Sequence, residues 1–273
     1  MIISEWLHRV RDSRPLVHNM TNLVVNNIVA NALLALGASP VMAYANEEVG
    51  DMAAMAGALA LNMGTLNPSL VSAMQVAGQS AQQAGVPIVF DPVGVGATKY
   101  RTQTANAITS QLQLTVLRGN AGEIGVMVDS GGRVSGVDSQ GAEEGLPYAM
   151  KQYAMDHHVV VVDTGETDFV TDGETIWKLQ NGHPLLATVT GSGCSLTGII
   201  GAFLAVVDDL QNFEKCAKAV IAAITCVNVA AEQAATVAKG PGTFQAAWLD
   251  ALYHLSDRQV DHQAIISVLD MKL

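Results

Sequence analysis

The pattern of apolar and polar positions predicts a helix near the start of the chain. Between Asn22 and Leu36 the apolar side chains recur every three or four residues, which is typical of a helix with one buried face. Thr21 or Asn22 can cap the first turn of this helix, and Gly37 supplies its C-terminal stop. A short apolar run over residues 39–44 follows the predicted turn.

The middle of the chain alternates between helical patterns and short apolar runs. Helical patterns at 70–83, 104–112 and 144–156 are each followed by a run typical of a buried strand, at 87–91, 114–118 and 159–163. Strands that alternate with helices pair in parallel through right-handed crossovers. The last run is apolar at successive positions, as expected of a sheet covered by helices on both faces.

The final third of the chain departs from this alternation. A hairpin pattern around Asp172 and Gly173 predicts an antiparallel appendage to the sheet. From Ala187 onward the pattern is mostly helical. No linker or repeat divides the 273 residues, so we expect one domain over residues 1–273 with a three-layer α/β fold.

Composition narrows the class of protein. Apolar residues make up 49% of the chain and charged residues 14%, which supplies a large core. The formal charge of −11, with no basic cluster to offset it, argues against a nucleic-acid partner. An acidic protein that binds a polyanion needs help from a metal ion, backbone amides or a well-placed arginine.

Cysteine usage and the apolar stretches indicate a cytoplasmic protein that does not cross a membrane. Cys194, Cys216 and Cys226 have spacings that fit no zinc site, and free thiols suit a reducing cytoplasm. Cys216 and Cys226 fall in helical pattern and are expected in the core. The charged residues within 1–14 do not resemble a signal peptide, and serine, threonine and glycine interrupt the apolar stretch 189–207 as in a buried helix.

Polar residues stand at the ends of three predicted strands. Asp91, Arg118 and Thr164 each occupy such a position, with Asp163 just before Thr164. Ligands of open α/β sheets bind beyond the carboxyl ends of parallel strands, so these side chains are expected to line one crevice. The guanidinium of Arg118 suits a phosphate better than a buried ion pair. Asp91 and Glu123 are candidate Mg²⁺ carboxylates; the alternative for each is a loop or helix-capping carboxylate.

A glycine-rich turn leads into the apolar helix near Ser195. The backbone amides of Gly191, Gly193 and Cys194 can form an anion site at a helix start, although many such turns only permit tight packing. Neither a P-loop nor a dinucleotide fingerprint occurs. A thiol at a helix N-terminus is expected to have a lowered pKa, which would make Cys194 a nucleophile or base. The alternative is a small buried apolar residue.

Taken in chain order, these segments resemble the hydroxyethylthiazole kinase family of the ribokinase-like superfamily. The matching stretches are His18–Asn22, Ala32–Ala43, Asn62–Leu66, Phe90–Ala97, Arg118–Ile124, Gly136–Asp138, Thr164–Glu166 and Gly191–Cys194. They span about residues 15–205. The resemblance implies ATP- and Mg²⁺-dependent phosphorylation of the hydroxyl of 4-methyl-5-(2-hydroxyethyl)thiazole, with ATP and the thiazole as the small-molecule partners.

The resemblance also implies residue roles. Positions matching Met42 and Gly191 contact the thiazole, those matching Arg118 and Thr164 contact ATP, and those matching Asp91 and Glu123 serve the metal and phosphates. Related kinases carry aspartate where this chain has Cys194, which is expected to orient the substrate hydroxyl and accept its proton late while the amides near Gly193 hold the transferred group. The family forms homotrimers with active sites between subunits, which makes the Asn22 and Met42 segments candidates for the interface.

Three alternatives remain open within the same fold. The chain could be another vitamin-precursor kinase, a nucleotide-dependent dehydratase, or a catalytically weak nucleotide-binding relative. Asp163 favours the last, because the family usually has an apolar or small residue there and a carboxylate could repel ATP phosphates or point away from them. Thiazole-dependent ADP release separates the kinase from all three.

Overall fold

The computed structural model describes residues 1–129 and 139–269. The family match predicted at Gly136–Asp138 therefore lies outside the described residues. The strands of the described chain form one sheet in the order β2-β1-β3-β4-β5-β6-β7-β8-β9. Their bounds are β1 Leu16–Met20, β2 Ser39–Val41, β3 Ala58–Asn62, β4 Ile88–Asp91, β5 Val116–Gly119, β6 Val160–Asp163, β7 Asp168–Thr171, β8 Ile176–Leu179 and β9 Ile266–Val268.

Strand direction follows the predicted division of the chain. The strands from β2 to β6 pair in parallel, and β6 to β9 pair in antiparallel fashion. The strands β7 and β8 form the expected hairpin across Asp172 and Gly173. The mostly parallel α/β sheet is therefore confirmed, whereas β1, β2, β3 and β9 were not predicted as strands.

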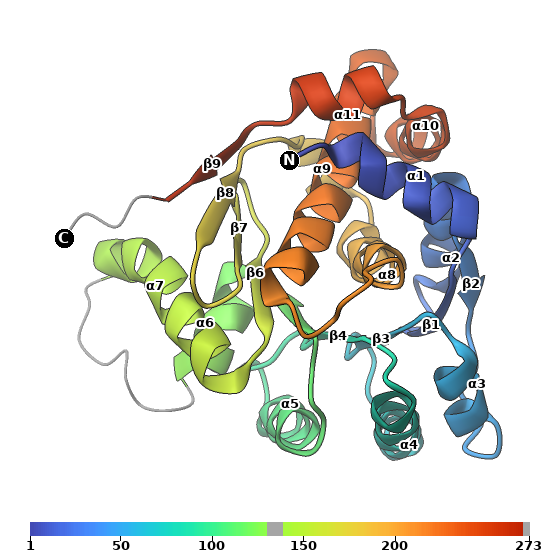
Figure 1. Ribbon diagram of the computed structural model, residues 1–273, viewed down its shortest axis with the longest axis vertical. Coiled ribbons are helices and arrows are strands. Elements are labelled where there is room, and N and C mark those ends of the chain that lie inside the picture. The colour runs from blue at the N-terminus through green and yellow to red at the C-terminus, as the bar shows by residue number, and fades with distance from the viewer. Residues whose placement is uncertain (130–138, 270–273) are drawn as a thin grey trace.

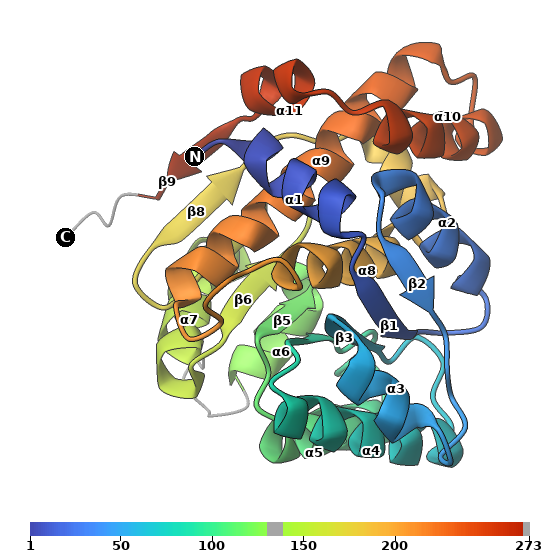
Figure 2. The ribbon, with the colours of Figure 1, turned by 45° about the vertical axis from the view of Figure 1, so that its right-hand side comes forward.

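Helices cover both faces of the sheet, which gives the three layers seen in Figure 1. One face carries α1 Ile3–Ser13, α2 Asn26–Leu36, α8 Ser192–Leu204 and α9 Phe213–Val237, with α10 Pro241–His254 and α11 Asp257–Gln263 outside them. The other face carries α3 Val49–Met55, α4 Pro68–Ala84, α5 Lys99–Gln111, α6 Ala121–Asp129 and α7 Ser139–His157. A 3₁₀ turn, η1 Pro184–Thr188, leads into α8. Figure 2 shows α8 and α9 side by side over one face of the sheet.

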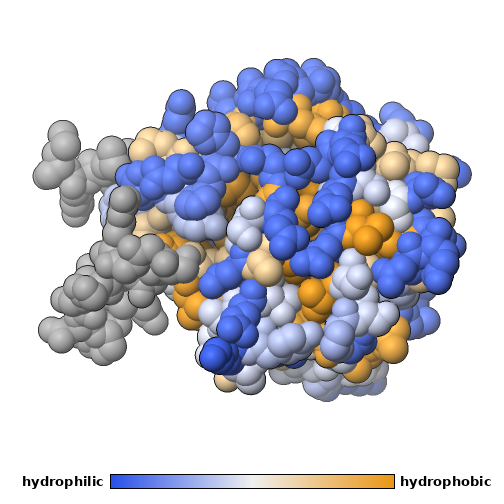
Figure 3. Space-filling view, turned by 90° about the horizontal axis from the view of Figure 1, so that it is seen from below, coloured by the Kyte–Doolittle hydropathy of each residue, from blue (hydrophilic) through white to orange (hydrophobic). Residues whose placement is uncertain are grey.

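Two clusters of buried apolar side chains lie between the sheet and the helices, one on each face of the sheet. Side chains along a strand alternate between them: Val89 and Val116 pack toward α8 and α9, while Phe90 and Leu117 pack toward α4 and α5. Viewed from the α4 and α5 side, the surface is largely hydrophilic with separate apolar patches (Figure 3). The alternation decides which strand-end side chains face α8.

The start of α2 differs from the prediction. Val25 precedes the first turn, and no side chain caps the helix. The predicted capping by Thr21 or Asn22 is therefore wrong, because both residues lie too far before Asn26 to reach its amides. The predicted stop is confirmed, since Gly37 ends the helix with φ 114°.

The apolar helices of the second half are core elements. Residues of α8 from Ser195 to Leu204 are buried, as predicted for the stretch 189–207. One helix of the described chain, α9, is long and apolar enough to cross a membrane, but 72% of its apolar window is buried within the protein. Cys216 and Cys226 lie on this helix and are fully buried, which confirms them as core residues.

Candidate functional site

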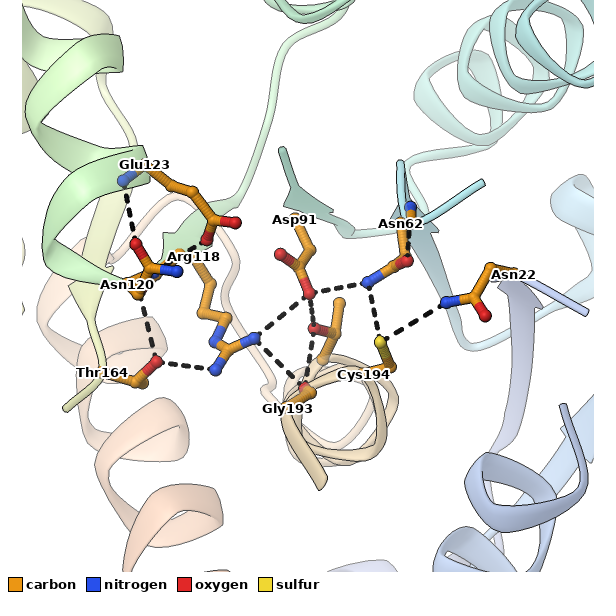
Figure 4. A network of polar contacts seen from close by, with 12 residues as sticks. Asn22, Asn62, Asp91, Arg118, Asn120, Glu123, Thr164, Gly193 and Cys194 are labelled. Atoms are coloured by element: carbon orange, nitrogen blue, oxygen red, sulfur yellow. Dashed lines mark hydrogen bonds and ion pairs between the residues drawn. The ribbon is translucent and has the colours of Figure 1, made fainter. Parts of the chain in front are cut away.

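Four polar side chains end neighbouring parallel strands on the face covered by α8. Asn62 ends β3, Asp91 ends β4, Arg118 lies near the end of β5, and Thr164 follows β6. By strand alternation Asp91 and Arg118 follow Val89 and Val116 onto the α8 face. Figure 4 shows these side chains meeting above the first turn of α8, as the sequence predicted for three of them.

Asp91 is the centre of this network. Its Oδ2 atom accepts hydrogen bonds from Asn62 Nδ2 at 2.8 Å, Thr197 Oγ1 at 2.7 Å and Arg118 Nη1 at 3.1 Å. Burial raises the pKa of Asp91, and the charge of Arg118 opposes that rise. The second carboxylate oxygen, Oδ1, is buried without a hydrogen-bond partner among the described residues. Asp91 thus keeps one oxygen available for a ligand.

Arg118 links Asp91 to the start of α8 and to Thr164. Its Nη1 also donates to the Gly193 carbonyl at 3.2 Å, and its Nη2 donates to Thr164 Oγ1 at 2.6 Å. Arg118 does form the buried ion pair that the sequence disfavoured, since its pair with Asp91 leaves the two side chains only 11% and 1% exposed, while its contact with a phosphate stays a prediction. The pairing follows from the adjacency of β4 and β5, which end on the same face.

The first turn of α8 provides free backbone amides. Gly191 precedes the helix with φ 94°, and a Cβ there would lie 2.5 Å from Ile28 Cγ2, so the position requires glycine. No described residue accepts a hydrogen bond from the N–H of Gly193 or Cys194. The turn is therefore tightly packed, and because free amides at a helix start attract anions, the anion site stays a prediction that these two amides allow.

Cys194 carries a thiol that is not activated in the way its position suggested. Its Sγ atom accepts hydrogen bonds from Asn62 Nδ2 at 3.4 Å and Asn22 Nδ2 at 3.7 Å. Burial, followed by the nearby Asp91 carboxylate, raises the pKa of Cys194. The predicted lowering of this pKa is therefore wrong, because burial and Asp91 outweigh the charge of Arg118 and the hydrogen bonds from Asn62 and Asn22.

Asn22 and Met42 lie just after β1 and β2, on the other side of the network from Thr164. Asn22 is buried, and its amide faces the Cys194 thiol (Figure 4). Met42 directly follows β2 and is half-buried against the same apolar cluster as Cys194. The adjacent carbonyl of Ala43 lies 2.9 Å from His18 Nε2, which fixes this segment to β1. The structure therefore brings Asn22 into the network, whereas Met42 packs against the apolar core cluster and its predicted contact with a substrate stays a prediction.

Glu123 lies in the first turn of α6, at the other end of the network. Its Oε1 accepts from the Gly94 N–H at 2.8 Å and its Oε2 from the Asn120 N–H at 3.0 Å. Asn120 Oδ1 in turn accepts from the Glu123 N–H at 3.0 Å, which is a reciprocal helix cap. The described residues contain no group of three or more His, Cys, Asp or Glu side chains able to enclose a metal ion. Glu123 thus serves as a capping carboxylate, the alternative that the sequence left open.

A cavity of about 990 Å³ opens beside Arg118 and Thr164. It extends from the start of α8 to the turn after β6 and to α9, and its lining includes Arg118, Asn120, Thr164, Gly165, Asp168, His183, Ser192, Gly193 and Asn228. Asp168 holds the turn after β6, accepting from the Gly165 N–H at 3.0 Å and from Asn228 Nδ2 at 2.7 Å. Burial raises the pKa of Asp168 to about 6.

Asp163 lies on the opposite face of the sheet from Thr164. Val161 packs toward α6 and α7 and Val162 toward α9, so alternation along β6 turns Asp163 away from the α8 face. Burial, then the charge of Asp168, raises the pKa of Asp163 to about 7, and its Oδ1 has no partner among the described residues. Of the two orientations considered from the sequence, Asp163 adopts the one that points away.

Two residues of the network were missed from the sequence as site residues. Asn62 joins Asp91 to Cys194, and Thr197 donates to Asp91. The available signals were an asparagine closing the apolar run 58–61 and a hydroxyl within an otherwise apolar helix. Neither signal distinguishes a site residue from a turn or a packed helix without knowledge of the sheet order.

The chain is similar to known proteins over nearly its whole length. The model of the hydroxyethylthiazole kinase family matches residues 7–258. A hydroxyethylthiazole kinase of Moorella thermoacetica is 51% identical over 261 residues, which cover 96% of each chain. The structure of a hydroxyethylthiazole kinase protein from Pyrococcus horikoshii OT3 is similar with a TM-score of 0.88 and 41% identity, covering 98% of this chain and 99% of that one. An ADP/ATP-dependent NAD(P)H-hydrate dehydratase from Bacillus subtilis shares the fold alone, at 15% identity, a TM-score of 0.55, and coverage of 88% and 90%.

Proposed function

The chain belongs to the hydroxyethylthiazole kinase family, and from this premise we propose how its site transfers phosphate. The reaction moves the γ-phosphoryl group of ATP to the hydroxyl of 4-methyl-5-(2-hydroxyethyl)thiazole. A new P–O bond forms to the alcohol, the bond to the ADP oxygen breaks, and the alcohol proton leaves. This is the phosphotransferase activity of a thiamine-salvage enzyme.

ATP would occupy the cavity beside Arg118 and Thr164. Arg118 keeps one donor, Nε, buried without a partner among the described residues, and Thr164 Oγ1 lies 2.6 Å from its Nη2. The free amides of Gly193 and Cys194 would hold the transferred group, whose charge is spread over its oxygens in the transition state. The thiazole would lie between Met42 and Gly191, with its hydroxyl toward Cys194.

Mg²⁺ fits the carboxylate at the centre of the network. Asp91 Oδ1 is a buried oxygen without a partner among the described residues, and Mg²⁺ binds through one or two carboxylates plus phosphates and water. Both oxygens of Glu123 already accept a backbone N–H, so this carboxylate would act through water in the ion's hydration shell. Bound there, Mg²⁺ would neutralise charge on the ATP phosphates.

Cys194 would orient the alcohol and would not be ionised before the reaction. Its raised pKa leaves a protonated thiol at neutral pH, and Sγ already accepts hydrogen bonds from two amides. A substrate hydroxyl can take the place of one of those donors. Phosphoryl transfer through a loose transition state needs positioning more than a strong base, and the alcohol proton leaves late, when the forming P–O bond has made it acidic. Because a protonated thiol is not a base, an oxygen of the transferred group would receive this proton, in place of Cys194 as the resemblance implied.

The observation that carries this proposal is the meeting of Asp91, Arg118, Cys194 and two free amides at one sheet edge in a chain of this family. The test is ADP formation from Mg-ATP with the hydroxyethylthiazole and with 5-ethyl-4-methylthiazole, which lacks the hydroxyl. We expect ADP release only with the alcohol. Equal release with both compounds, or with neither, would rule out the thiazole kinase and favour the dehydratase or the catalytically weak relative.

We also propose one domain, a cytoplasmic location and a homotrimer. One sheet contains all strands of the described residues, and the three cysteines are free thiols, as suits a reducing compartment. Leu23 and Val24 are each 76% exposed directly beside Asn22, an arrangement that suits contact with a second subunit. Light scattering should give three times the chain mass, and a monomer with full activity would contradict the trimer.

A further inference from the structure

Arg101 binds the backbone of two loops that carry site residues. It lies in the first turn of α5, where its own N–H bonds to Thr98 Oγ1 at 3.2 Å. Its Nη1 donates to the carbonyls of Met63 and Val93, at 2.6 Å each, and its Nη2 to that of Gly64 at 2.9 Å. Met63 follows β3 directly, and Val93 lies two residues after β4. One guanidinium thus joins the segments that follow Asn62 and Asp91.

Gly64, whose carbonyl accepts from Arg101, is also bonded to Asn62 of the network around Asp91. The Gly64 N–H donates to Asn62 Oδ1 at 2.9 Å, which leaves Nδ2 of that amide to face Asp91 and Cys194. An inverted Asn62 amide would place two donors against each other at Gly64 and an oxygen against the Asp91 carboxylate. The orientation of Asn62 therefore depends on the position of the Gly64 peptide.

The Val93 carbonyl, which accepts from Arg101, belongs to the same peptide group as the Gly94 N–H that bonds Glu123. The next N–H along the chain, that of Gly94, donates to Glu123 Oε1 at 2.8 Å. Gly94 has φ 73°, and a Cβ there would lie 3.2 Å from Arg101 Cδ, so the arginine packs directly over this turn. Arg101 therefore holds the peptide that presents the N–H to Glu123.

We propose that Arg101 is a positioning residue for phosphoryl transfer, acting on Asp91 and Cys194 through Asn62 and on Glu123 through Gly94. The inference rests on the proposed roles of these three residues. The Arg101 guanidinium bonds only backbone carbonyls of the described chain and would touch neither substrate. A planar guanidinium serves three carbonyls in fixed directions, which an ammonium group reproduces only in part.

The first test compares Arg101→Met and Arg101→Lys with Lys99→Met, which removes an exposed cation from the same turn. Loss of a residue that supports catalytic ligands costs about 10- to 100-fold in activity. We expect Arg101→Met to lose kcat by that factor while both KM values change by less than about threefold, because no substrate contact is lost. Arg101→Lys should recover part of the loss, and Lys99→Met should match the wild type.

A second test uses the unliganded protein, so that it does not depend on the substrate. Amide hydrogen exchange at Gly64 and Gly94 should accelerate in Arg101→Met and remain unchanged in Lys99→Met. Wild-type kcat values in Arg101→Met, or unchanged exchange at both amides, would overturn the proposal. The proposal would also be overturned if the loss of kcat in Arg101→Met were fully explained by a smaller fraction of folded protein. If the wild type itself failed to phosphorylate the thiazole, the proposed function would fall, while hydrogen exchange would still decide whether Arg101 holds the two loops.

Discussion

Replacing Asp163 by asparagine should remove a pH-dependent cost to stability. The pKa of Asp163 is raised from 3.8 to about 7, mainly by burial, so this carboxyl is neutral in the folded protein at pH values where it is ionised in the unfolded chain. A group of this kind stabilises the fold fully below about pH 4, and that stability is lost as the pH rises through 7. At about 1.36 kcal/mol per pH unit the difference amounts to about 4 kcal/mol, of which about 2.6 kcal/mol falls between pH 5 and pH 8.

The assay is urea denaturation of the wild type and Asp163→Asn at pH 5, 6.5 and 8. The free energy of unfolding of the variant, relative to the wild type, should rise by about 2–3 kcal/mol from pH 5 to pH 8. Glu174→Gln, which neutralises an exposed carboxylate in the β7–β8 turn, is the matched control and should show no such trend. If the difference in free energy of unfolding between Asp163→Asn and the wild type were the same at all three pH values, the raised pKa of Asp163 would be refuted.

Three further substitutions test separate parts of the site. Cys194→Ala should lower kcat by about tenfold or more through lost positioning of the alcohol, with Cys194→Ser retaining more activity; unchanged turnover in the ADP-release assay would remove Cys194 from the mechanism. Thr164→Val should raise the KM for ATP about tenfold by removing a hydroxyl beside Arg118, and an unaltered KM would mean that ATP does not bind at this turn. Gly191→Ala should cost about 1–3 kcal/mol of stability because its φ of 94° and the contact with Ile28 both exclude a Cβ, and an unchanged denaturation midpoint would contradict that packing.

The part of the site at the ends of β4, β5 and β6 could largely be predicted from local patterns. The strands β4, β5 and β6 start and end within two residues of the predicted runs, because continuous apolar runs bounded by polar residues mark buried strands. Asp91, Arg118 and Thr164 stand at their ends, and strands that pair in parallel end at one edge. Their convergence follows from those two facts.

The part of the site around Asn62 and Cys194 depends on contacts between residues far apart in the sequence. Asn62 acquires its place only because β3 pairs between β1 and β4, which no local pattern indicates. The pKa of Cys194 depends on burial and on Asp91, more than a hundred positions earlier in the chain, so the helix N-terminus alone predicted the wrong direction. Arg118 likewise meets Asp91 because of strand adjacency rather than any motif.

The most direct test of the account is the ratio of thiazole phosphate to ADP formed by the wild-type protein from Mg-ATP and hydroxyethylthiazole. Mass spectrometry would identify the phosphate ester, and the same reaction would be followed for Asp91→Asn. We expect one ester for each ADP with the wild type and a large loss of both products with the variant. ADP formed without the ester, or an Asp91→Asn protein with wild-type rates, would contradict the claim that this sheet edge phosphorylates the thiazole alcohol.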